Sequence, residues 1–439
     1  MDNHVAVIGA GMAGLGAAYS LRQQGIPCTV FEPGKKAGGR MTTEKIGDFH
    51  VDTGASFVVK YFKAVSDLVH EIGMQDEMRV LARNAASLYR DGKFHTVSMS
   101  NPFTALTFRG VSLKSQLSMI GVLPDYLKHF FKVNSFLNAY KGVAIDDENA
   151  YDWLKRRTSQ ELADYLGDPV CRALCMYPLK DMSKLNFMAY SLSVLNMKLY
   201  SFREGMGSVP ARLSRDLDIR YGARVTSVEQ KGGRVEVSWS DGNRTQTGDY
   251  AAAVVAVWGD LVPEIVKGLS PLETEIFSST QYSTTWPVAI TTDVPIHNPF
   301  YGVYISPGES ECLASFGIED AKGNQNVPPG KGCLFCVTKE EFVRSFKGTR
   351  EQFGEIVARD AVKFFPYIQG HITGIHVFRW DRAVEKMPPG RFSILHGLNT
   401  QWPKDRRVFV AGAYLIAPCT DGAFTSGRQA AEKVAKVLN

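Results

Sequence analysis

The chain has 439 residues, of which 44% are hydrophobic and 22% are charged. This composition is typical of an ordered globular protein, and the length exceeds what one compact core supports, so we expect two domains. The net charge of +5 comes from 50 basic and 45 acidic residues spread along the chain. Such a small surplus gives no basis for nucleic-acid binding, although it is compatible with weak attraction to an anionic surface or an acidic substrate.

Seven cysteines, an odd number in so long a chain, favour a reducing compartment over a disulfide framework. Cys333 and Cys336 form one CxxC pair in an apolar run, and because a zinc site needs four ligands, we interpret them as core residues and expect no metal. Residues 5–21 lack the basic flank of a signal peptide, and residues 185–197 fall short of the ~20 residues of a spanning helix. We expect a cytoplasmic protein whose membrane contact is at most peripheral.

A dinucleotide-binding pattern opens the chain. Residues 5–8 (Val-Ala-Val-Ile) predict a buried strand, Gly9, Gly11 and Gly14 follow at GxGxxG spacing, and the next ten residues are rich in alanine and leucine, as in a helix. Gly9 would make the tight turn, Gly11 would let the backbone approach a pyrophosphate, and Gly14 would let the helix pack on the strand. The free N–H groups of the helix start would then face the phosphates.

A second strand is predicted over residues 28–31 and ends at Glu32. A carboxylate at this position can accept hydrogen bonds from both ribose hydroxyls of an adenosine, and it would repel a 2′-phosphate. A βαβ unit that binds no ligand is the alternative, but it does not explain why all these elements coincide.

Two further motifs follow: Gly38-Gly39-Arg40, and an Asp-Thr-Gly-Ala sequence that ends in Gly54 and Ala55. The glycines predict a tight loop, and Arg40 would place a bidentate cation beside the pyrophosphate. With GAGxAG and the acidic residue, these motifs resemble the N-terminus of the flavin amine oxidase superfamily, which includes monoamine oxidases, protoporphyrinogen oxidases and carotenoid and squalene-type desaturases. The resemblance implies FAD as the cofactor, and it is non-covalent because no cysteine matches an attachment site.

The resemblance recurs near the C-terminus, where a strand and turn over residues 407–412 precede a last helix. In the family this turn and helix start lie against the flavin ring and ribityl chain, and a valine further upstream contacts the adenine through its backbone. The resemblance therefore implies cofactor contacts by Gly9, Gly11, Ala13, Gly14, Glu32, Gly38, Gly39, Arg40, Gly54, Ala55, Val225, Gly412, Asp421, Gly422 and Ala423.

The expected fold is α/β, with a discontinuous Rossmann-type FAD-binding domain (residues 1–56, 202–263 and 388–439) and an α+β substrate domain (57–201 and 264–387). In the substrate domain, alternating segments predict a mixed sheet, covered by helices. Residues 111–137 have helical spacing, and Pro124 would divide this stretch. We interpret it first as an amphipathic cover over the active site and second as a membrane-facing patch.

The resemblance implies an FAD-dependent oxidoreductase, an oxidase or desaturase, that transfers a hydride from a substrate C–H bond to flavin N5. Electrons would pass to oxygen or a quinone, since no second GxGxxG follows a strand. The catalytic residues stay unknown; Trp380, Tyr414 and Cys419 are candidates for contact with the flavin. Oligomeric state is left open.

Two departures from the amine oxidase pattern bear on the small-molecule substrate. Cys419 stands where those enzymes place an aromatic residue, and no lysine occurs in residues 282–290. They favour an apolar or ring-bearing substrate. A flavin amine oxidase acting on a primary or secondary amine is the main alternative, followed by a non-redox flavin isomerase and by a binding protein resembling Rab GDP-dissociation inhibitors. A third departure concerns the cofactor: Ala413 replaces an acidic residue, so one ribityl or phosphate contact of the family is not expected here.

Overall fold

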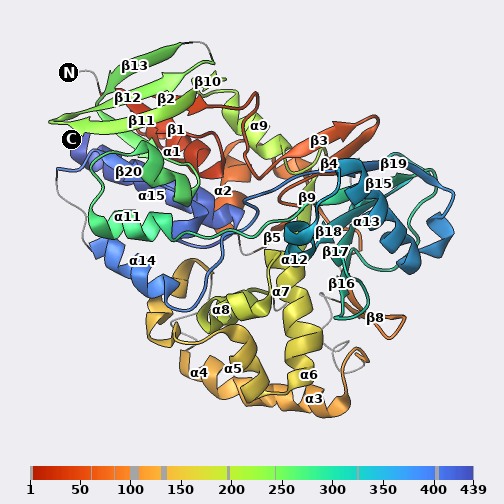
Figure 1. The fold of residues 1–439 in the computed structure, drawn as a ribbon. Helices are drawn as coiled ribbons and strands as arrows, with labels where there is room; N and C mark the ends of the chain where they lie inside the picture. Colours follow the sequence, from red (N-terminus) through yellow and green to blue (C-terminus); the bar gives the residue numbers. More distant parts are fainter. Residues whose placement is uncertain are drawn as a thin grey trace.

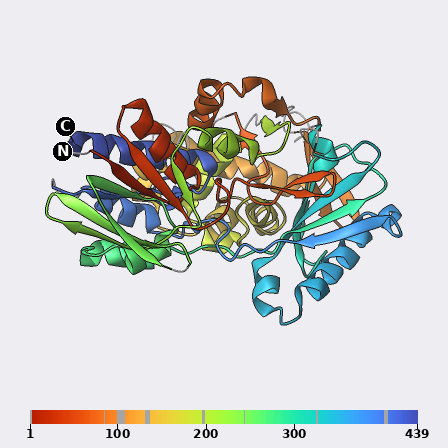
Figure 2. The same cartoon turned by 90° about the horizontal axis from the view of Figure 1, so that it is seen from above.

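The structure is a computed structural model, and it describes residues 3–60, 62–83, 85–98, 108–129, 136–194, 198–242, 244–323, 326–400 and 405–438. Figures 1 and 2 show two β-sheet regions at opposite ends of the molecule, with a group of helices between and below them. Among the described residues, every helix is too short or too polar to cross a bilayer.

The first region contains a five-stranded sheet that is parallel throughout. Its order is β10 (Ile219–Tyr221), β2 (Cys28–Glu32), β1 (Val5–Ile8), β14 (Ala252–Val255) and β20 (Val408–Val410). β1 and β14 are apolar and buried at every position, because both faces of a parallel sheet are covered.

One face of this sheet is covered by α1 (Met12–Gln23) and α15 (Thr420–Leu438), and the other by an antiparallel sheet of β11 (Arg224–Lys231), β12 (Arg234–Ser240) and β13 (Thr245–Tyr250). The two helices cross closely, since a Cβ atom on Gly427 would lie 2.0 Å from the Ala13 carbonyl oxygen. This crossing holds the start of α15 next to the start of α1.

The second region contains a seven-stranded mixed sheet in which only the β16–β7 pair is parallel. Its order is β19 (Ile372–Val377), β15 (Val288–Thr292), β18 (Gly332–Thr338), β17 (Leu313–Ile318), β16 (Gly302–Ile305), β7 (Ala85–Arg90) and β8 (Lys93–Ser98). Helix α13 (Arg350–Phe364) packs on one face. Cys333 and Cys336 are buried residues of β18, as the sequence indicates.

Short strands join the two regions: β3 (Thr43–Ile46) pairs with β4 (Phe49–Asp52), and β9 (Leu199–Phe202) pairs with β5 (Val58–Val59) and β6 (Met78–Val80). The remaining helices are α2 (Lys63–Glu71), α3 (Leu113–Ser118), α4 (Leu123–His129), α5 (Ala150–Arg157), α6 (Gln160–Leu162), α7 (Asp168–Cys175), α8 (Lys184–Val194), α9 (Ser208–Ser214), α10 (Val262–Ile265), α11 (Pro271–Ser278), α12 (Glu340–Ser345) and α14 (Arg391–Thr400). The 3-10 turns are η1 (Gln75–Glu77), η3 (Met119–Val122), η4 (Phe136–Ile145), η6 (Leu179–Asp181), η7 (Gly259–Leu261), η8 (Glu319–Lys322), η9 (Pro366–Ile368) and η10 (Ala413–Leu415), and η5 (Ala163–Gly167) is a π-helical turn.

The α/β class and the mixed second sheet agree with the sequence-based predictions. The five-stranded sheet takes its strands from all three stretches that the sequence assigns to the FAD domain, so we propose to keep those domain boundaries. The predicted division at Pro124 is also present, because α4 begins one residue earlier and η3 separates it from α3. The end of that predicted helical stretch, over residues 130–135, lies outside the described residues.

Candidate active site

A cavity of about 900 Å³ runs between the two sheet regions and is lined by both. It brings together residues from the start, middle and end of the chain. The predicted site residues on its wall are Gly9, Gly11, Ala13, Glu32, Gly38, Gly39, Arg40, Gly54, Ala55, Val225, Trp380, Gly412, Tyr414, Cys419 and Ala423.

The turn between β1 and α1 leaves room for a ligand at the start of α1. Gly9 has a φ of +101°, and its N–H donates to the Phe31 carbonyl at 2.8 Å. A Cβ on Gly14 would lie 1.8 Å from the Gly9 oxygen, whereas a Cβ on Gly11 would meet no protein atom within 4 Å. Gly14 therefore serves packing, and the space beside Gly11, at a helix start with no side-chain cap, fits a phosphate group.

Glu32 lies at the end of β2, beside this turn. Its Oε2 accepts a hydrogen bond from the Ala10 N–H at 2.9 Å, and its Oε1 accepts one from the Gly34 N–H at 2.8 Å. These two backbone contacts fix the carboxylate on the cavity wall. Because each carboxylate oxygen can accept more than one hydrogen bond, Glu32 keeps acceptor capacity for the hydroxyls of a ribose.

Arg40 connects the Gly-Gly-Arg loop to the segment that leaves the second region. Its Nη1 donates to the Ala383 carbonyl at 2.9 Å, its Nη2 pairs with Glu385 Oε1 at 2.6 Å, and the guanidinium lies 4.6 Å from the Trp258 ring centroid. Burial alone would lower the pKa of Arg40, but the attraction of buried Glu385 outweighs it and raises the pKa. Two of the Arg40 donors therefore hold the Gly-Gly-Arg loop against the segment that contains Ala383 and Glu385.

Three predicted residues do not lie on the cavity wall. Gly14 packs against Gly9, as described, and a Cβ on Gly422 would lie 2.2 Å from the Ala417 oxygen. Asp421 is 1% exposed, and its Oδ1 accepts a hydrogen bond from the Val65 N–H at 2.8 Å. The cofactor contact expected of Asp421 stays a prediction for its backbone, because its carboxylate stabilises the start of α2, where free N–H groups attract an anion. Burial raises its pKa to about 6.

The three candidates for flavin contact lie on the wall in different settings. Trp380 donates from Nε1 to the Thr53 carbonyl at 2.7 Å, which ties it to the loop before Gly54. Tyr414 is 2% exposed and its ring packs over Gly412. Burial raises the pKa of the Cys419 thiol to about 12, so the thiol is protonated and uncharged near neutral pH.

One part of the cavity wall is contributed by elements outside the five-stranded sheet, and we call it the substrate end. It is built by β5, α7, α8, β9, β16, β17 and β18. Of the described wall residues that these elements contribute, none is charged. Six aromatic residues in or beside these elements line it: Phe57, Tyr190, Tyr301, Tyr304, Phe316 and Phe335. This arrangement suits an uncharged substrate with flat or extended apolar parts.

A buried ion-pair cluster lies behind this wall. Lys322 Nζ is 2.8 Å from Asp52 Oδ2 and 2.7 Å from Glu319 Oε2, and all three side chains are fully buried. Asp52 Oδ1 also accepts hydrogen bonds from Thr43 Oγ1 and the Met206 N–H. Burial raises the pKa of Glu319 to about 7, although Lys322 opposes the shift. Because Asp52 precedes the Gly54 loop and Glu319 follows β17, the cluster joins the two halves of the cavity.

Sequence reasoning missed Glu385, Trp258, Tyr301 and Lys322. Glu385 lies five residues after Trp380, which the sequence analysis names as a candidate for flavin contact, and this proximity was the available signal. The others carry no local signal, because Lys322 and Asp52 are 270 positions apart and only the folded chain brings them together.

The comparisons with known proteins agree with this geometry. The family model for flavin containing amine oxidoreductase matches residues 12–435. A tobacco mitochondrial protoporphyrinogen oxidase is 28% identical over 245 residues, which are 55% of this chain and 46% of that enzyme. A phytoene dehydrogenase from Streptomyces griseus is 27% identical over 54% of this chain and 52% of that enzyme. The chain thus spans about half the length of these curated relatives.

Among solved structures, wild-type putrescine oxidase bound to putrescine matches with a TM-score of 0.79 and 18% identity, over 99% of both chains. Identity at this level shows the fold alone. The fold in question is the α/β arrangement described above, which confirms the predicted architecture.

Proposed function

We infer the chemistry of the cavity from one premise, that the chain belongs to the family of flavin-containing amine oxidoreductases. Membership confirms the resemblance seen in the sequence, and we propose that the protein acts as an FAD-dependent oxidoreductase. The substrate, the residues that hold FAD and the electron acceptor are proposals. When bound, FAD supplies the two-electron acceptor that takes a hydride from the substrate carbon at N5.

We propose that the wall residues of the GxGxxG end hold the dinucleotide. The start of α1 beside Gly11 would take the pyrophosphate, Glu32 the ribose and Val225 the adenine. The open space beside Gly11 supports this placement, because no protein atom fills it. Arg40 would act chiefly by fixing its loop against Ala383 and Glu385. The flavin ring would then face Trp380, Tyr414 and Cys419.

The substrate we propose is apolar or ring-bearing and uncharged, oxidised by desaturation or related C–H oxidation. The observation that supports this proposal is the composition of the substrate end, whose described wall residues include six aromatic side chains and no charged one. Such a wall excludes water and orients a substrate carbon by shape, and positioning of this kind supplies much of the rate in hydride transfer. The two curated relatives reported above carry the names protoporphyrinogen oxidase and phytoene dehydrogenase, and neither name is that of an amine.

An amine oxidase is the second candidate, favoured by the likeness to putrescine oxidase. The substrate end disfavours it for a diamine, since a distal ammonium group would need a carboxylate or a cage of acceptors there. Oxygen or a quinone would accept the electrons. We also propose a cytoplasmic location, supported by seven cysteines that are all free.

The test is an anaerobic screen of candidate reductants with the purified holoprotein, read as bleaching of the oxidised-flavin absorbance band. We expect bleaching by a tetrapyrrole precursor, a polyene or another ring-bearing apolar compound, and none by aliphatic amines or diamines. Bleaching by amines alone, with peroxide release in air, would contradict the proposed substrate class and favour the second candidate.

A further inference from the structure

An exposed apolar stripe runs along α3, η3 and α4. Among the described residues, half of the strongly exposed large hydrophobic side chains belong to this short stretch, and Leu127 and Ile120 are 76% and 65% exposed. The spacing of the stripe places it on one side of the helical segment. We call it the docking face, and it consists of Leu113, Leu117, Met119, Ile120, Leu123 and Leu127.

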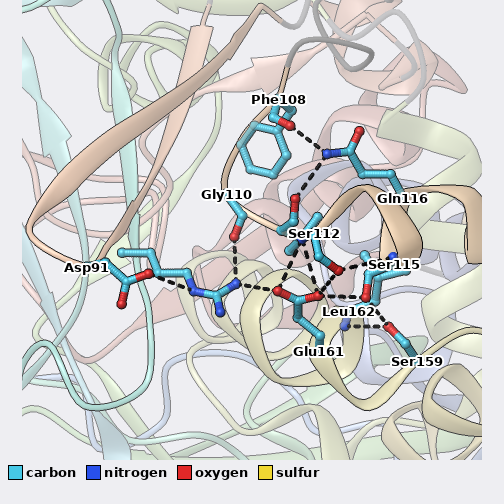
Figure 3. Close-up of polar contacts among 11 residues, drawn as sticks. Asp91, Phe108, Gly110, Ser112, Ser115, Gln116, Ser159, Glu161 and Leu162 are labelled. Atoms are coloured by element: carbon cyan, nitrogen blue, oxygen red, sulfur yellow. Dashed lines mark hydrogen bonds and ion pairs between the residues drawn. The ribbon is translucent and has the colours of Figure 1, made fainter.

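The opposite side of α3 is polar and anchored to the body of the protein (Figure 3). Ser112 caps the helix, and Ser112 and Ser115 both donate to Glu161, the latter at 2.7 Å. Arg90 Nη1 reaches the same carboxylate at 2.8 Å. Burial would raise the pKa of Glu161, but these donors outweigh it and lower the pKa to about 2, so the carboxylate stays charged.

The inner side of α4 is held in the same manner. Asp125 accepts a hydrogen bond from Trp153 Nε1 at 2.7 Å and pairs with Arg157 at 2.6 Å, and Tyr126 contacts Ser191. An ordinary surface helix buries its apolar side and exposes its polar side. Here Val122 and Tyr126 pack inward, but the six large apolar side chains of the docking face are exposed, so the stretch differs from an ordinary amphipathic cover.

The charges around the docking face are positive. Arg109, Lys114 and Lys128 are exposed, and the acidic residue within the stretch, Asp125, is neutralised by Arg157. A second copy of the chain bound through the same face would bring these cations together, which is unfavourable. An anionic lipid surface would instead attract them while it accepts the leucines.

We propose that residues 109–129 dock the protein on an anionic membrane surface, with the docking face in the interfacial layer and the three basic residues among the headgroups. Figure 1 shows α3 and α4 along the lower edge of the molecule, beside α5 and α6 and away from the five-stranded sheet. The membrane would lie close to the substrate end, since Tyr126 contacts α8 next to the wall residue Tyr190. This inference rests on the surface and does not depend on the proposed substrate.

The test is co-sedimentation of the full-length holoprotein with vesicles of neutral phosphatidylcholine, with and without anionic phosphatidylglycerol. We expect binding to the anionic vesicles that weakens as salt is added. Leu117→Asp/Leu127→Asp should reduce binding roughly tenfold or more. Lys114→Glu/Lys128→Glu should weaken binding to anionic vesicles roughly fivefold for each unit of positive charge lost, and should leave binding to neutral vesicles unchanged. The control Ile356→Asp, on an exposed position of α13, should bind like the unmodified protein.

Each variant must keep its flavin-to-protein ratio and circular dichroism spectrum, which separates lost docking from lost folding. The proposal is overturned if the unmodified protein stays in the supernatant with both vesicle types, or if Leu117→Asp/Leu127→Asp binds equally well. Concentration-dependent dimerisation that this variant abolishes, without any vesicle binding, would overturn it in favour of a second copy.

Discussion

Replacing Lys322 by methionine removes the cation shared by two fully buried carboxylates, at 2.8 Å from Asp52 and 2.7 Å from Glu319. Removing one partner of a buried ion pair costs about 3–5 kcal/mol, because the remaining charge is left uncompensated. We therefore expect Lys322→Met to lower the free energy of unfolding by about 3 kcal/mol or more near neutral pH. Loosening of the loop that follows Asp52 should also weaken retention of FAD.

The loss should grow with pH, and the direction follows from Glu319. Its pKa in the folded chain, about 7, exceeds the ordinary value of 4.5, so folding favours the protonated form and stability falls as pH rises through this range. In Lys322→Met the opposing cation is gone and the pKa of Glu319 rises further. Between about pH 7 and about pH 8.5 the unmodified protein completes this titration, whereas the variant continues to lose stability by at most about 1.4 kcal/mol per pH unit.

The assay is urea unfolding followed by circular dichroism at both pH values. The matched control is Lys331→Met, whose ammonium lies 3.8 Å from Asp48 on the surface and should matter by less than about 0.5 kcal/mol. In the double variant Lys322→Met/Glu319→Gln, the loss of unfolding free energy should no longer increase with pH, since glutamine cannot ionise. A Lys322→Met protein within about 1 kcal/mol of the unmodified one, or a deficit that does not change with pH, would refute the reasoning.

Three other predictions concern Gly11, Glu161 and Cys419. Gly11→Asp should give a folded but colourless protein, because a carboxylate would fill the space open to the pyrophosphate. The control Gly233→Asp, in the turn between β11 and β12 with equally open surroundings, should stay yellow. A Gly11→Asp protein with its full content of flavin would count against the site. Glu161→Gln should destabilise the fold by about 1–3 kcal/mol at neutral pH. Between pH 4.5 and about 2 the variant should lose less stability than the unmodified protein, which there loses the contribution of a carboxylate whose pKa is lowered to about 2. Urea unfolding across this range checks both expectations, and identical curves would contradict them. Cys419 should react slowly with iodoacetamide in the native holoprotein, since its thiol is half-buried on the cavity wall and has a pKa raised to about 12. Rapid alkylation, detected by mass spectrometry, would contradict this expectation.

Much of the nucleotide-binding half could be predicted because its signals are local. The β1 strand, the Gly9 turn and the start of α1 occupy consecutive residues, and each glycine has a steric reason that the structure bears out at Gly9 and Gly14. The distant C-terminal glycine segment was identified through the family resemblance, and the crossing of α1 and α15 at Gly427 shows why it meets the N-terminal one.

Contacts between distant residues could not be predicted. Arg40 carries a motif, but its partner Glu385 lies 345 positions away, and the Lys322 cluster depends on the packing of both halves. Asp421 was singled out through the family resemblance, and the hydrogen bond that its carboxylate accepts from α2 had no signal in the sequence. Helical spacing over residues 111–137 was visible in the sequence, yet the outward direction of the apolar side of α3 is set by Glu161, which lies on another helix.

The central claim is that one FAD occupies the cavity between the two sheet regions. It is tested most directly by titrating FAD into the folded, flavin-stripped full-length chain and counting bound FAD per chain. The account predicts saturation at one FAD per chain in the unmodified protein, with binding lost in Gly11→Asp. A folded chain that binds no FAD, or a Gly11→Asp protein that saturates normally, would contradict it.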